Sequence, residues 1–384
     1  MNLPMAPTLP MAPSQAGGPA LSSQEIADLQ EEVRALAAER GAVILAHNYQ
    51  LPEVQDVADY VGDSLGLSRV AAAAEGEAIV FCGVHFMAET ASILCPDKTV
   101  LIPDLDAGCS LAESIDFDQL SAWKATYPEG VVVMYVNTTA EVKALTDYCC
   151  TSSNAVEVVR HIYATHGPDT EILFGPDMWL GAYVEKQLGK RMHVWDGECH
   201  VHAGIRPSDI DAIRAAHPGA DFLIHPECGC STSVMEYVAA GDVSAQGVHM
   251  LSTGGMLKYA KDAEQEAVAE HEGTSGRPAR DAGQDATTAR DADQDETAIR
   301  DGRPSAKRRE AVVATEIGML YPLRMAAPDI DFIPANAEAY CKYMRMITLP
   351  KLRDALRDMQ FEVRVPEDIA TRARVPIDRM VALG

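Results

Sequence analysis

The chain has 384 residues, 47% of them hydrophobic, which is enough for a large core divided among two or three domains. Its formal net charge of −25 argues against a nucleic-acid-binding protein, because such proteins normally carry a basic face. No stretch reaches the roughly 18 uninterrupted apolar residues that a membrane-spanning helix needs. We therefore expect an acidic globular protein that binds neither nucleic acid nor membrane.

Residues 1–22 are rich in Pro, Ala, Met and Gly. They contain neither the basic segment nor the continuous apolar segment of a secretory signal peptide. This composition predicts a disordered leader on a cytoplasmic protein.

Short apolar runs alternate with helical stretches through the body of the chain. Runs that are apolar throughout are typical of parallel strands buried on both faces of a sheet. The sequence therefore predicts an α/β fold. The expected strands lie at residues 42–46, 78–81, 99–102, 131–135, 171–174, 192–195, 221–224 and 312–314.

Polar motifs recur where three of these strands end. The interval from His47 to Asn137 is 90 residues, and so are the intervals from Asn137 to Glu227 and from Cys109 to Cys199. A repeated interval indicates a triplicated α/β unit. Because ligands bind at the carboxyl ends of parallel strands, three such units can converge on one central cavity. The motifs are His47-Asn48-Tyr49, Tyr135-Val136-Asn137 and His225-Pro226-Glu227.

The repeat divides the chain into predicted domains. We expect a first α/β domain at residues 23–110, joined by the C-terminal helices within 345–384, a second at 111–200 and a third at 201–344. Residues 273–304 contain one Ile and no Leu, Val, Phe, Tyr, Trp or Met. Such a segment cannot bury a core, so it predicts a disordered acidic insertion in the third domain.

Nine cysteines are present, an odd number that argues against a disulfide framework in a reducing compartment. Their spacing includes no C-x₂-C pair and leaves two interpretations open: small buried side chains, or thiolate ligands of an iron–sulfur cluster. Cys228 and Cys230 are one residue apart, which makes a disulfide between them strained. We expect packing roles for Cys82, Cys95, Cys149, Cys150, Cys228 and Cys230.

An ordered series of motifs resembles the bacterial quinolinate synthases, the family that builds the pyridine ring of NAD. The resemblance runs from about Val43 to Leu356, outside the acidic insertion. So many motifs in the same order make the match specific. Besides the three strand-end motifs, they lie at residues 62–65, 86–91, 103–104, 107–112, 150–155, 174–177, 197–202, 225–228, 252–256, 314–318 and 341–344.

The resemblance implies three homologous α/β/α sandwich domains with short parallel sheets around a pseudo-threefold axis, and an active site at the centre. It implies one [4Fe–4S] cluster per chain, held by Cys109, Cys199 and Cys341. Three protein ligands leave one iron open as a Lewis acid. The implied reaction condenses iminoaspartate with dihydroxyacetone phosphate to quinolinate, with loss of phosphate and two waters. An L-aspartate oxidase is the implied functional partner.

The resemblance also implies roles for the strand-end residues. Tyr49 is expected to move protons during ring closure and His47 to contact the substrate, although such a pair can also simply cap the next helix. Glu227 is the expected general base. Tyr135 and Asn137 are expected to orient substrate carboxylates by hydrogen bonds, and Tyr135 also counts among the expected catalytic residues.

Small hydroxyl side chains at predicted helix starts favour anion binding, because backbone N–H groups are free there. Ordinary helix caps show the same pattern. With His225, they complete the expected substrate-binding set. The hydroxyl residues are Ser64, Ser152, Ser252 and Thr253.

Two other functions remain open at this point. One is a different non-redox [4Fe–4S] hydro-lyase on the same scaffold. The other is a cluster-bearing sensor without catalytic activity, which would have four protein ligands and would leave His47, Tyr49 and Glu227 without a role.

Overall fold

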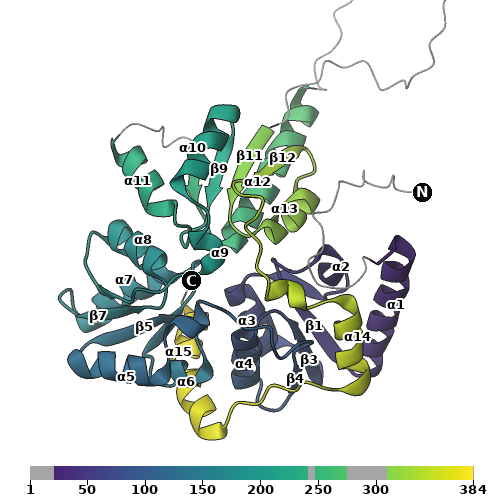
Figure 1. The fold of residues 1–384 in the computed structure, drawn as a ribbon, viewed down its shortest axis with the longest axis horizontal. Coiled ribbons are helices and arrows are strands. Elements are labelled where there is room, and N and C mark those ends of the chain that lie inside the picture. The colour runs from purple at the N-terminus through teal and green to yellow at the C-terminus, as the bar shows by residue number, and fades with distance from the viewer. Residues whose placement is uncertain (1–20, 241–246, 275–308, 384) are drawn as a thin grey trace, which may run out of the picture.

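The computed structural model describes residues 21–240, 247–274 and 309–383. Within these ranges, twelve strands form three separate four-stranded parallel sheets with helices between the strands. Figure 1 shows the three sheets, each flanked by helices, grouped around a common centre. The predicted α/β fold of three repeated units is confirmed. Residues 1–20 of the predicted leader and 275–304 of the predicted insertion lie outside the described residues.

All three sheets have the same strand order. Within each unit the second strand lies at one edge and is followed by the first, third and fourth strands, as in the order β2-β1-β3-β4. Every adjacent pair is parallel. The chain reverses its winding direction between the first and third strands, so each sheet opens a crevice at the carboxyl ends of that pair.

The first unit begins with a helix whose N-terminus carries a capping box made by Ser22 and Glu25. Its central strands are apolar because helices cover both faces of the sheet, and the side chains of β3 are buried throughout. The elements are α1 (Ser23–Glu39), β1 (Ala42–His47), α2 (Pro52–Gln55), β2 (Tyr60–Gly62), α3 (Ser64–Ala73), β3 (Ala78–Cys82), α4 (His85–Leu94), β4 (Thr99–Leu101) and the 3-10 helix η1 (Ala112–Ser114).

The second unit repeats this plan. Asp177 accepts a hydrogen bond from the Leu180 N–H and so caps α8, which follows the third strand of the unit. The elements are α5 (Phe117–Thr126), β5 (Val131–Tyr135), α6 (Ala140–Lys143), β6 (Tyr148–Cys150), α7 (Ala155–His166), β7 (Ile172–Gly175), α8 (Met178–Leu188), β8 (His193–Val194) and α9 (His200–Ala203).

The third unit follows the same order and continues into the C-terminal helices. Glu316 caps the 3-10 helix after its third strand by accepting the Gly318 N–H. The elements are α10 (Pro207–Ala216), β9 (Asp221–Ile224), α11 (Ser231–Ala240), β10 (Val248–Met250), α12 (Thr253–Thr274), β11 (Arg309–Ala314), η2 (Ile317–Met319), α13 (Leu320–Ala326), β12 (Ile330–Pro334), η3 (Met344–Met346), α14 (Leu349–Asp358) and α15 (Glu367–Ala382).

The structure corrects one interval of the predicted repeat. His47 and Tyr135 end β1 and β5, and His225 directly follows β9, so these three residues are equivalent. They are 88 and 90 residues apart. The predicted 90-residue step from His47 to Asn137 therefore joined positions two residues out of register. Cys109 and Cys199, which are 90 residues apart, do follow equivalent fourth strands.

The two C-terminal helices lie on different units. Helix α14 packs against α1 and β3 of the first unit. The chain then pairs along the edge of β4, where the Val363 N–H donates to the Val100 carbonyl at 2.8 Å. Helix α15 packs against α6 and β6 of the second unit and also touches α4. It thus bridges two units, and the exact domain boundaries stay a prediction.

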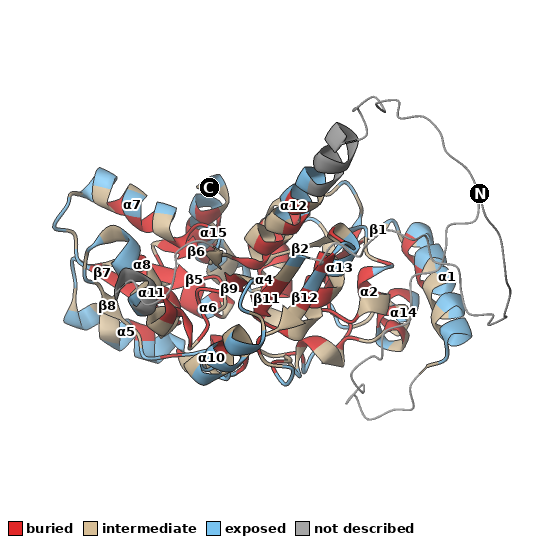
Figure 2. Cartoon of the chain, turned by 90° about the horizontal axis from the view of Figure 1, so that it is seen from above, coloured by how far each residue is buried: buried red, intermediate tan, exposed pale blue. Residues whose placement is uncertain are grey.

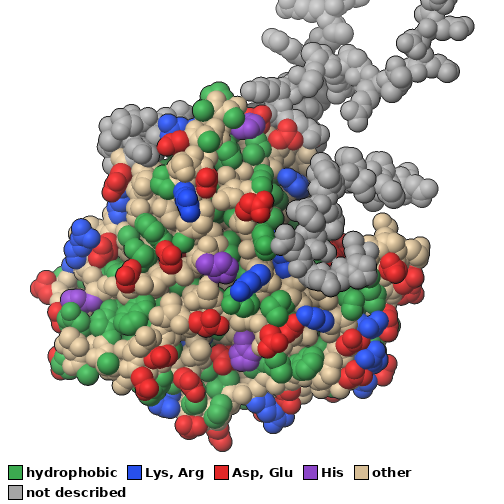
Figure 3. Space-filling view, viewed as in Figure 1, with side chains coloured by type: hydrophobic (Ala, Val, Ile, Leu, Met, Phe, Trp, Pro, Cys, Tyr) green, Lys and Arg blue, Asp and Glu red, His purple; other side chains and the backbone are tan. Residues whose placement is uncertain are grey.

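Buried side chains concentrate on the sheets and on the inner faces of the helices, as Figure 2 shows in red. The outer faces of α1, α7 and α10 are largely exposed. Among the described helices, none is both long and apolar enough to span a bilayer. On the face shown in Figure 3, acidic and basic side chains are interspersed.

Candidate active site

A cavity lies where the three units meet, with an empty volume of about 660 Å³ including its open mouth. Every predicted site residue except Ser252 lines it. Those residues are His47, Tyr49, Ser64, Cys109, Tyr135, Asn137, Ser152, Cys199, His225, Glu227, Thr253 and Cys341.

The three predicted cysteine ligands occupy equivalent positions. Each follows the fourth strand of its unit and begins a short helical turn. The Cys109 thiol accepts hydrogen bonds from the backbone N–H groups two and three residues ahead, and the Cys341 thiol does the same. Cys199 occupies the N-cap position of α9. Backbone donors aimed at sulfur favour the thiolate form, which is the form that binds metals.

The three sulfurs also lie near one another. Burial raises the pKa of the Cys109 thiol, and the neighbouring Cys199 and Cys341 raise it further. Burial likewise raises the pKa of Cys341 to about 12, with a contribution from Cys199. Such a group of thiols resists ionisation unless a cation joins it, because metal binding requires and stabilises thiolates. All nine cysteines are free.

Hydroxyl groups at or just before helix starts form another part of the cavity lining. Ser64 begins α3, Thr253 begins α12, and Ser152 precedes α7. Ser153 joins these three segments, since its Oγ lies 2.8 Å from Asp63 Oδ2 and 2.9 Å from Ser252 Oγ. Ser252 is thus a neighbour of the cavity rather than part of its lining. Helix N-termini and hydroxyls together favour anionic ligands.

A buried network of polar side chains lies between the cysteines and the hydroxyl groups. The Tyr49 hydroxyl lies 2.6 Å from Thr315 Oγ1 and 3.3 Å from His202 Nε2. His202 Nε2 lies 3.0 Å from the same Thr315 hydroxyl. Tyr49 belongs to the first unit, His202 to the second and Thr315 to the third. The network therefore depends on all three units at once.

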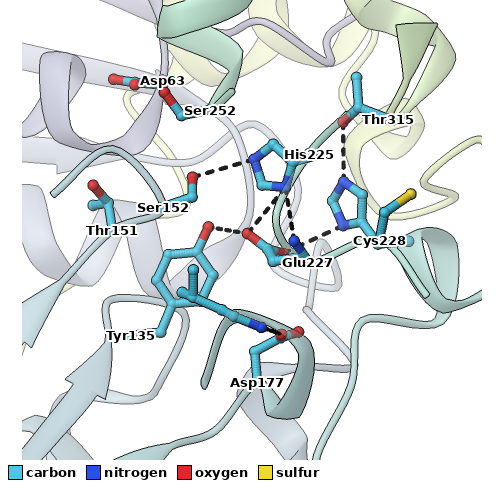
Figure 4. Close-up of polar contacts among 12 residues, drawn as sticks. Asp63, Tyr135, Thr151, Ser152, Asp177, His225, Glu227, Cys228, Ser252 and Thr315 are labelled. Carbon is cyan, nitrogen blue, oxygen red and sulfur yellow. Dashed lines mark hydrogen bonds and ion pairs between the residues drawn. The ribbon is translucent and has the colours of Figure 1, made fainter. Parts of the chain in front are cut away.

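Glu227 lies at the centre of this network, as Figure 4 shows. Its Oε2 is 3.3 Å from His202 Nδ1, and its Oε1 accepts a hydrogen bond from the Tyr135 hydroxyl. Burial opposes ionisation of this carboxyl group, but the facing imidazoles of His225 and His202 and the Tyr135 hydroxyl outweigh it and lower its pKa to about 2. Burial also opposes protonation of His202, yet the surrounding groups, Tyr49 first, raise its pKa well above 6.5. Glu227 and His202 thus form a buried carboxylate–imidazolium pair.

Two other histidines are neutral. Burial lowers the pKa of both His47 and His225 to about 4. In each, Nδ1 accepts the backbone N–H two residues ahead, from Tyr49 at 3.2 Å and from Glu227 at 3.4 Å. The single proton of each neutral ring is therefore assigned to Nε2. In His225 this nitrogen lies 3.2 Å from Ser152 Oγ.

Sequence reasoning missed four buried polar residues of this site. His202, Thr315 and Glu316 lie within motifs that carried the family resemblance, but no role was assigned to them. Asp177, beside the site, also ends such a motif. The ligand atoms of Cys199, His202 and Glu227 lie within 4.8 Å of one another, so this group could hold a metal ion. The only signal in the sequence was the position of these residues at strand ends or after a cysteine.

Comparison with known proteins agrees with this geometry. The family model described as "Quinolinate synthetase A protein" matches residues 31–272 and 281–382. A quinolinate synthase of Thermus thermophilus is 50% identical over 356 residues, which cover 93% of this chain and 97% of the relative. Quinolinate synthase of Mycobacterium tuberculosis is 50% identical over 354 residues, covering 92% of this chain and 88% of the relative. The chain belongs to the quinolinate synthase family.

Membership of the quinolinate synthase family confirms the resemblance found in the sequence and makes this protein an enzyme of that family. The buried cysteines outside the cavity, Cys228 and Cys230 among them, have their side chains within the core.

Proposed function

We propose that the chain condenses iminoaspartate with dihydroxyacetone phosphate to quinolinate, releasing phosphate and two waters, at the central cavity. The observation that carries this proposal is that one cysteine from each unit reaches the same cavity, in a chain that belongs to the quinolinate synthase family. The atoms of the two substrates balance those of the products without gain or loss of electrons. No external oxidant or reductant is therefore needed.

The donor set fits the [4Fe–4S] cluster that we propose as cofactor. Cys109, Cys199 and Cys341 offer three soft sulfur ligands from three separate loops. Burial raises the pKa of the Cys109 and Cys341 thiols, so these two favour the neutral form until a cation joins them. When bound, a cluster with three protein ligands has one open iron, a Lewis acid able to bind a substrate oxygen.

The hydroxyl groups of the cavity lining suit the anionic parts of the substrates. Ser64, Ser152 and Thr253 lie at the starts of three helices, whose free N–H groups bind phosphate and carboxylate well. Asn137 and Tyr135 also line the cavity and can hold a carboxylate by hydrogen bonds. The anionic groups of the substrates would thus lie at these side chains.

The buried network supplies the proton transfers that dehydration and ring closure require. The imidazolium of His202 is stabilised by Glu227 and hydrogen-bonded toward Tyr49. We propose that Tyr49 passes protons between His202 and the substrate, with Thr315 holding the Tyr49 hydroxyl. Glu227, which we expected to be the general base, would act together with His202 because its own pKa is low. His47 would donate a hydrogen bond to the substrate through Nε2.

We further propose a cytoplasmic setting and a functional link to an L-aspartate oxidase. Free cysteines are expected in a compartment that keeps thiols reduced. Iminoaspartate is unstable, so an oxidase that forms it from aspartate must work at the same time.

The test is reconstitution under anaerobic conditions. Wild-type protein should bind iron and sulfide, show the broad visible absorbance of an iron–sulfur cluster, and convert the two substrates into a pyridine dicarboxylate. Substitution of Cys109, Cys199 or Cys341 by Ala should abolish both cluster and product. Cys82→Ala, a change at a buried cysteine on β3, is the matched control and should retain both.

Two results would contradict the proposal. Retention of the full cluster by all three Cys→Ala variants would show that these residues are not its ligands. A stable cluster without formation of the pyridine product would favour another hydro-lyase or a sensor.

A further inference from the structure

Two of the three units place a buried carboxyl group beside their cavity cysteine. Asp177 follows β7 in the second unit, and Glu316 follows β11 in the third. Both side chains are fully buried, at 0% exposure. The equivalent position after β3 in the first unit is Val84, which has no polar side chain. The carboxyl groups thus accompany Cys199 and Cys341 but not Cys109.

Glu316 holds the backbone of Cys341 directly. Its Oε1 accepts the Cys341 N–H at 3.0 Å, and its Oε2 accepts the Gly318 N–H at 2.5 Å. Arg345, four residues after Cys341, brings its guanidinium to 3.8 Å from Oε1. The carboxylate is thereby fixed from two sides, and it fixes the residue whose sulfur faces the cavity.

Asp177 has the corresponding place next to Cys199. Its Oδ1 accepts the Leu180 N–H at 2.7 Å, while its buried Oδ2 lacks a hydrogen-bond partner. The backbones of Asp177 and Gly197 form a parallel bridge, which places Asp177 beside the segment that leads into Cys199. The Met178 N–H also donates to the Gly197 carbonyl at 2.8 Å, which keeps the segment before Cys199 against Asp177.

We propose that Glu316 and Asp177 are positioning residues for the geometry in which all three thiols converge on one cluster. Glu316 holds the backbone of Cys341 by a direct hydrogen bond. Asp177 holds the segment before Cys199 by capping α8, whose first residue is hydrogen-bonded to Gly197. The inference rests on the proposed function for the identity of the cluster. Side chains that hold metal ligands in place contribute to metal affinity, and their loss typically weakens metal binding by about 10- to 100-fold.

The inference predicts an asymmetry among the three cysteines. In the metal-free protein, Cys341 should become mobile when Glu316 is changed, and Cys199 when Asp177 is changed. The mobility of Cys109 should be unchanged in both variants, because the first unit has Val84 at the position equivalent to Asp177 and Glu316. All three cysteines are partly exposed, so a small alkylating reagent can reach them.

The experiment measures alkylation of the metal-free protein by iodoacetamide, with the modified cysteines quantified by mass spectrometry. In Glu316→Gln the amide cannot accept both N–H groups, so the rate at Cys341 relative to Cys109 should rise about fivefold, as expected for loss of one hydrogen bond. Asp177→Ala, which removes the acceptor of the Leu180 N–H, should raise the Cys199 to Cys109 ratio. After reconstitution, each variant should release iron to a chelator about 10- to 100-fold faster than wild type.

Glu185→Gln is the matched control. Glu185 is also largely buried and accepts a backbone N–H, that of Met192 at 2.7 Å, but it does not line the cavity. It should leave all three rates unchanged. Because the rates are compared within one molecule, general loosening of the fold would raise them together and leave the ratios constant.

Unchanged ratios in both variants, or equal changes in the control, would overturn the inference. Glu316→Gln preserves side-chain size, so it tests the inference even if Asp177→Ala fails to fold. If the three Cys→Ala variants instead keep their cluster, the proposed function fails, while the alkylation ratios still report whether the carboxyl groups hold the two cysteines.

Discussion

The Tyr49 hydroxyl, just after β1, lies 2.6 Å from the Thr315 hydroxyl, just after β11. This contact joins the first and third units inside the cavity, and His202 of the second unit approaches both oxygens. These contacts fix the position of the Tyr49 hydroxyl inside the cavity. A variant that removes only this hydroxyl therefore tests the chemical role of Tyr49 and leaves the packing of its ring unchanged.

Tyr49→Phe removes the hydroxyl and preserves the ring. If Tyr49 moves protons, kcat should fall by about 10²- to 10⁴-fold, the usual contribution of a positioned acid or base. The iron content should not change, because Tyr49 is not one of the three proposed ligands of the cluster. Tyr60→Phe, at a side chain that is 51% exposed, is the control and should keep full activity. A kcat within twofold of wild type in Tyr49→Phe would refute a role in proton transfer.

Glu227→Gln should destabilise the metal-free protein as well as lower its activity. The change leaves His202 without its buried counter-charge, and breaking a buried ion pair from one side costs about 3–5 kcal/mol. Urea denaturation of the metal-free protein measures the loss of unfolding free energy. Glu310→Gln is the control, since its 3.2 Å contact with His217 is partly exposed and should be worth about 0–1 kcal/mol. Equal losses in the two variants would argue against a carboxylate–imidazolium pair at Glu227.

The stability that His47 and His225 contribute to the metal-free protein should fall as the pH is lowered from about 6.5 to about 4, whereas Glu316, whose pKa burial raises to about 7, contributes in the opposite direction. Burial keeps His47 and His225 neutral down to about pH 4, whereas unfolded histidines take up a proton near 6.5. The unfolded state binds more protons within this window, so each histidine contributes a slope of up to about 1.4 kcal/mol per pH unit. In denaturation measured between these pH values, His225→Asn should therefore gain stability relative to wild type as the pH is lowered. The exposed His166→Asn serves as the control, and an unchanged slope in His225→Asn would contradict the prediction.

Gly318→Ala should disturb the site without touching the substrate. A Cβ at Gly318 would lie 2.6 Å from Glu316 Oε2 and 2.8 Å from the Tyr49 carbonyl oxygen. Relieving such contacts costs about 1–3 kcal/mol and would shift both residues, so stability and activity should fall together. Gly219→Ala meets no atom within 4 Å and should behave like wild type. A fully active and equally stable Gly318→Ala variant would contradict this prediction, because it would show that Glu316 and Tyr49 move away from the added methyl group at little cost in free energy.

The sequence predicted the six central strands and two edge strands, β4 and β8, and missed the edge strands β2, β6, β10 and β12. Fully apolar runs mark β1, β3 and β5 because those strands are covered on both faces. Strands β2, β6 and β10 have three residues each, and their sequences, YVG, YCC and VHM, contain no run of Val, Ile or Leu that marks a buried strand. Strand β12 includes the exposed Asp331 between buried positions, so its run is interrupted.

The residues of the site were likewise predicted only in part. The family resemblance pointed to the cysteines and to the strand-end residues Tyr49 and Glu227, all of which line the cavity. It did not reveal that His202 and Thr315 connect Tyr49 to Glu227, because such contacts join residues from different units. Only the three-dimensional arrangement brings these positions, more than 100 residues apart in sequence, within hydrogen-bond distance.

The three units share a backbone plan but place different side chains at equivalent positions, as Tyr49, Asn137 and Glu227 illustrate, each two residues after the end of the first strand or the residue that follows it. Identical rings of side chains would offer a small planar diacid three interchangeable poses, only one of which could present a given carbon to a given proton donor. Chemical divergence among the repeats removes that degeneracy, so the enclosure selects one pose. It also means that no single repeat could have performed the present reaction alone, since each contributes a different part of one shared apparatus.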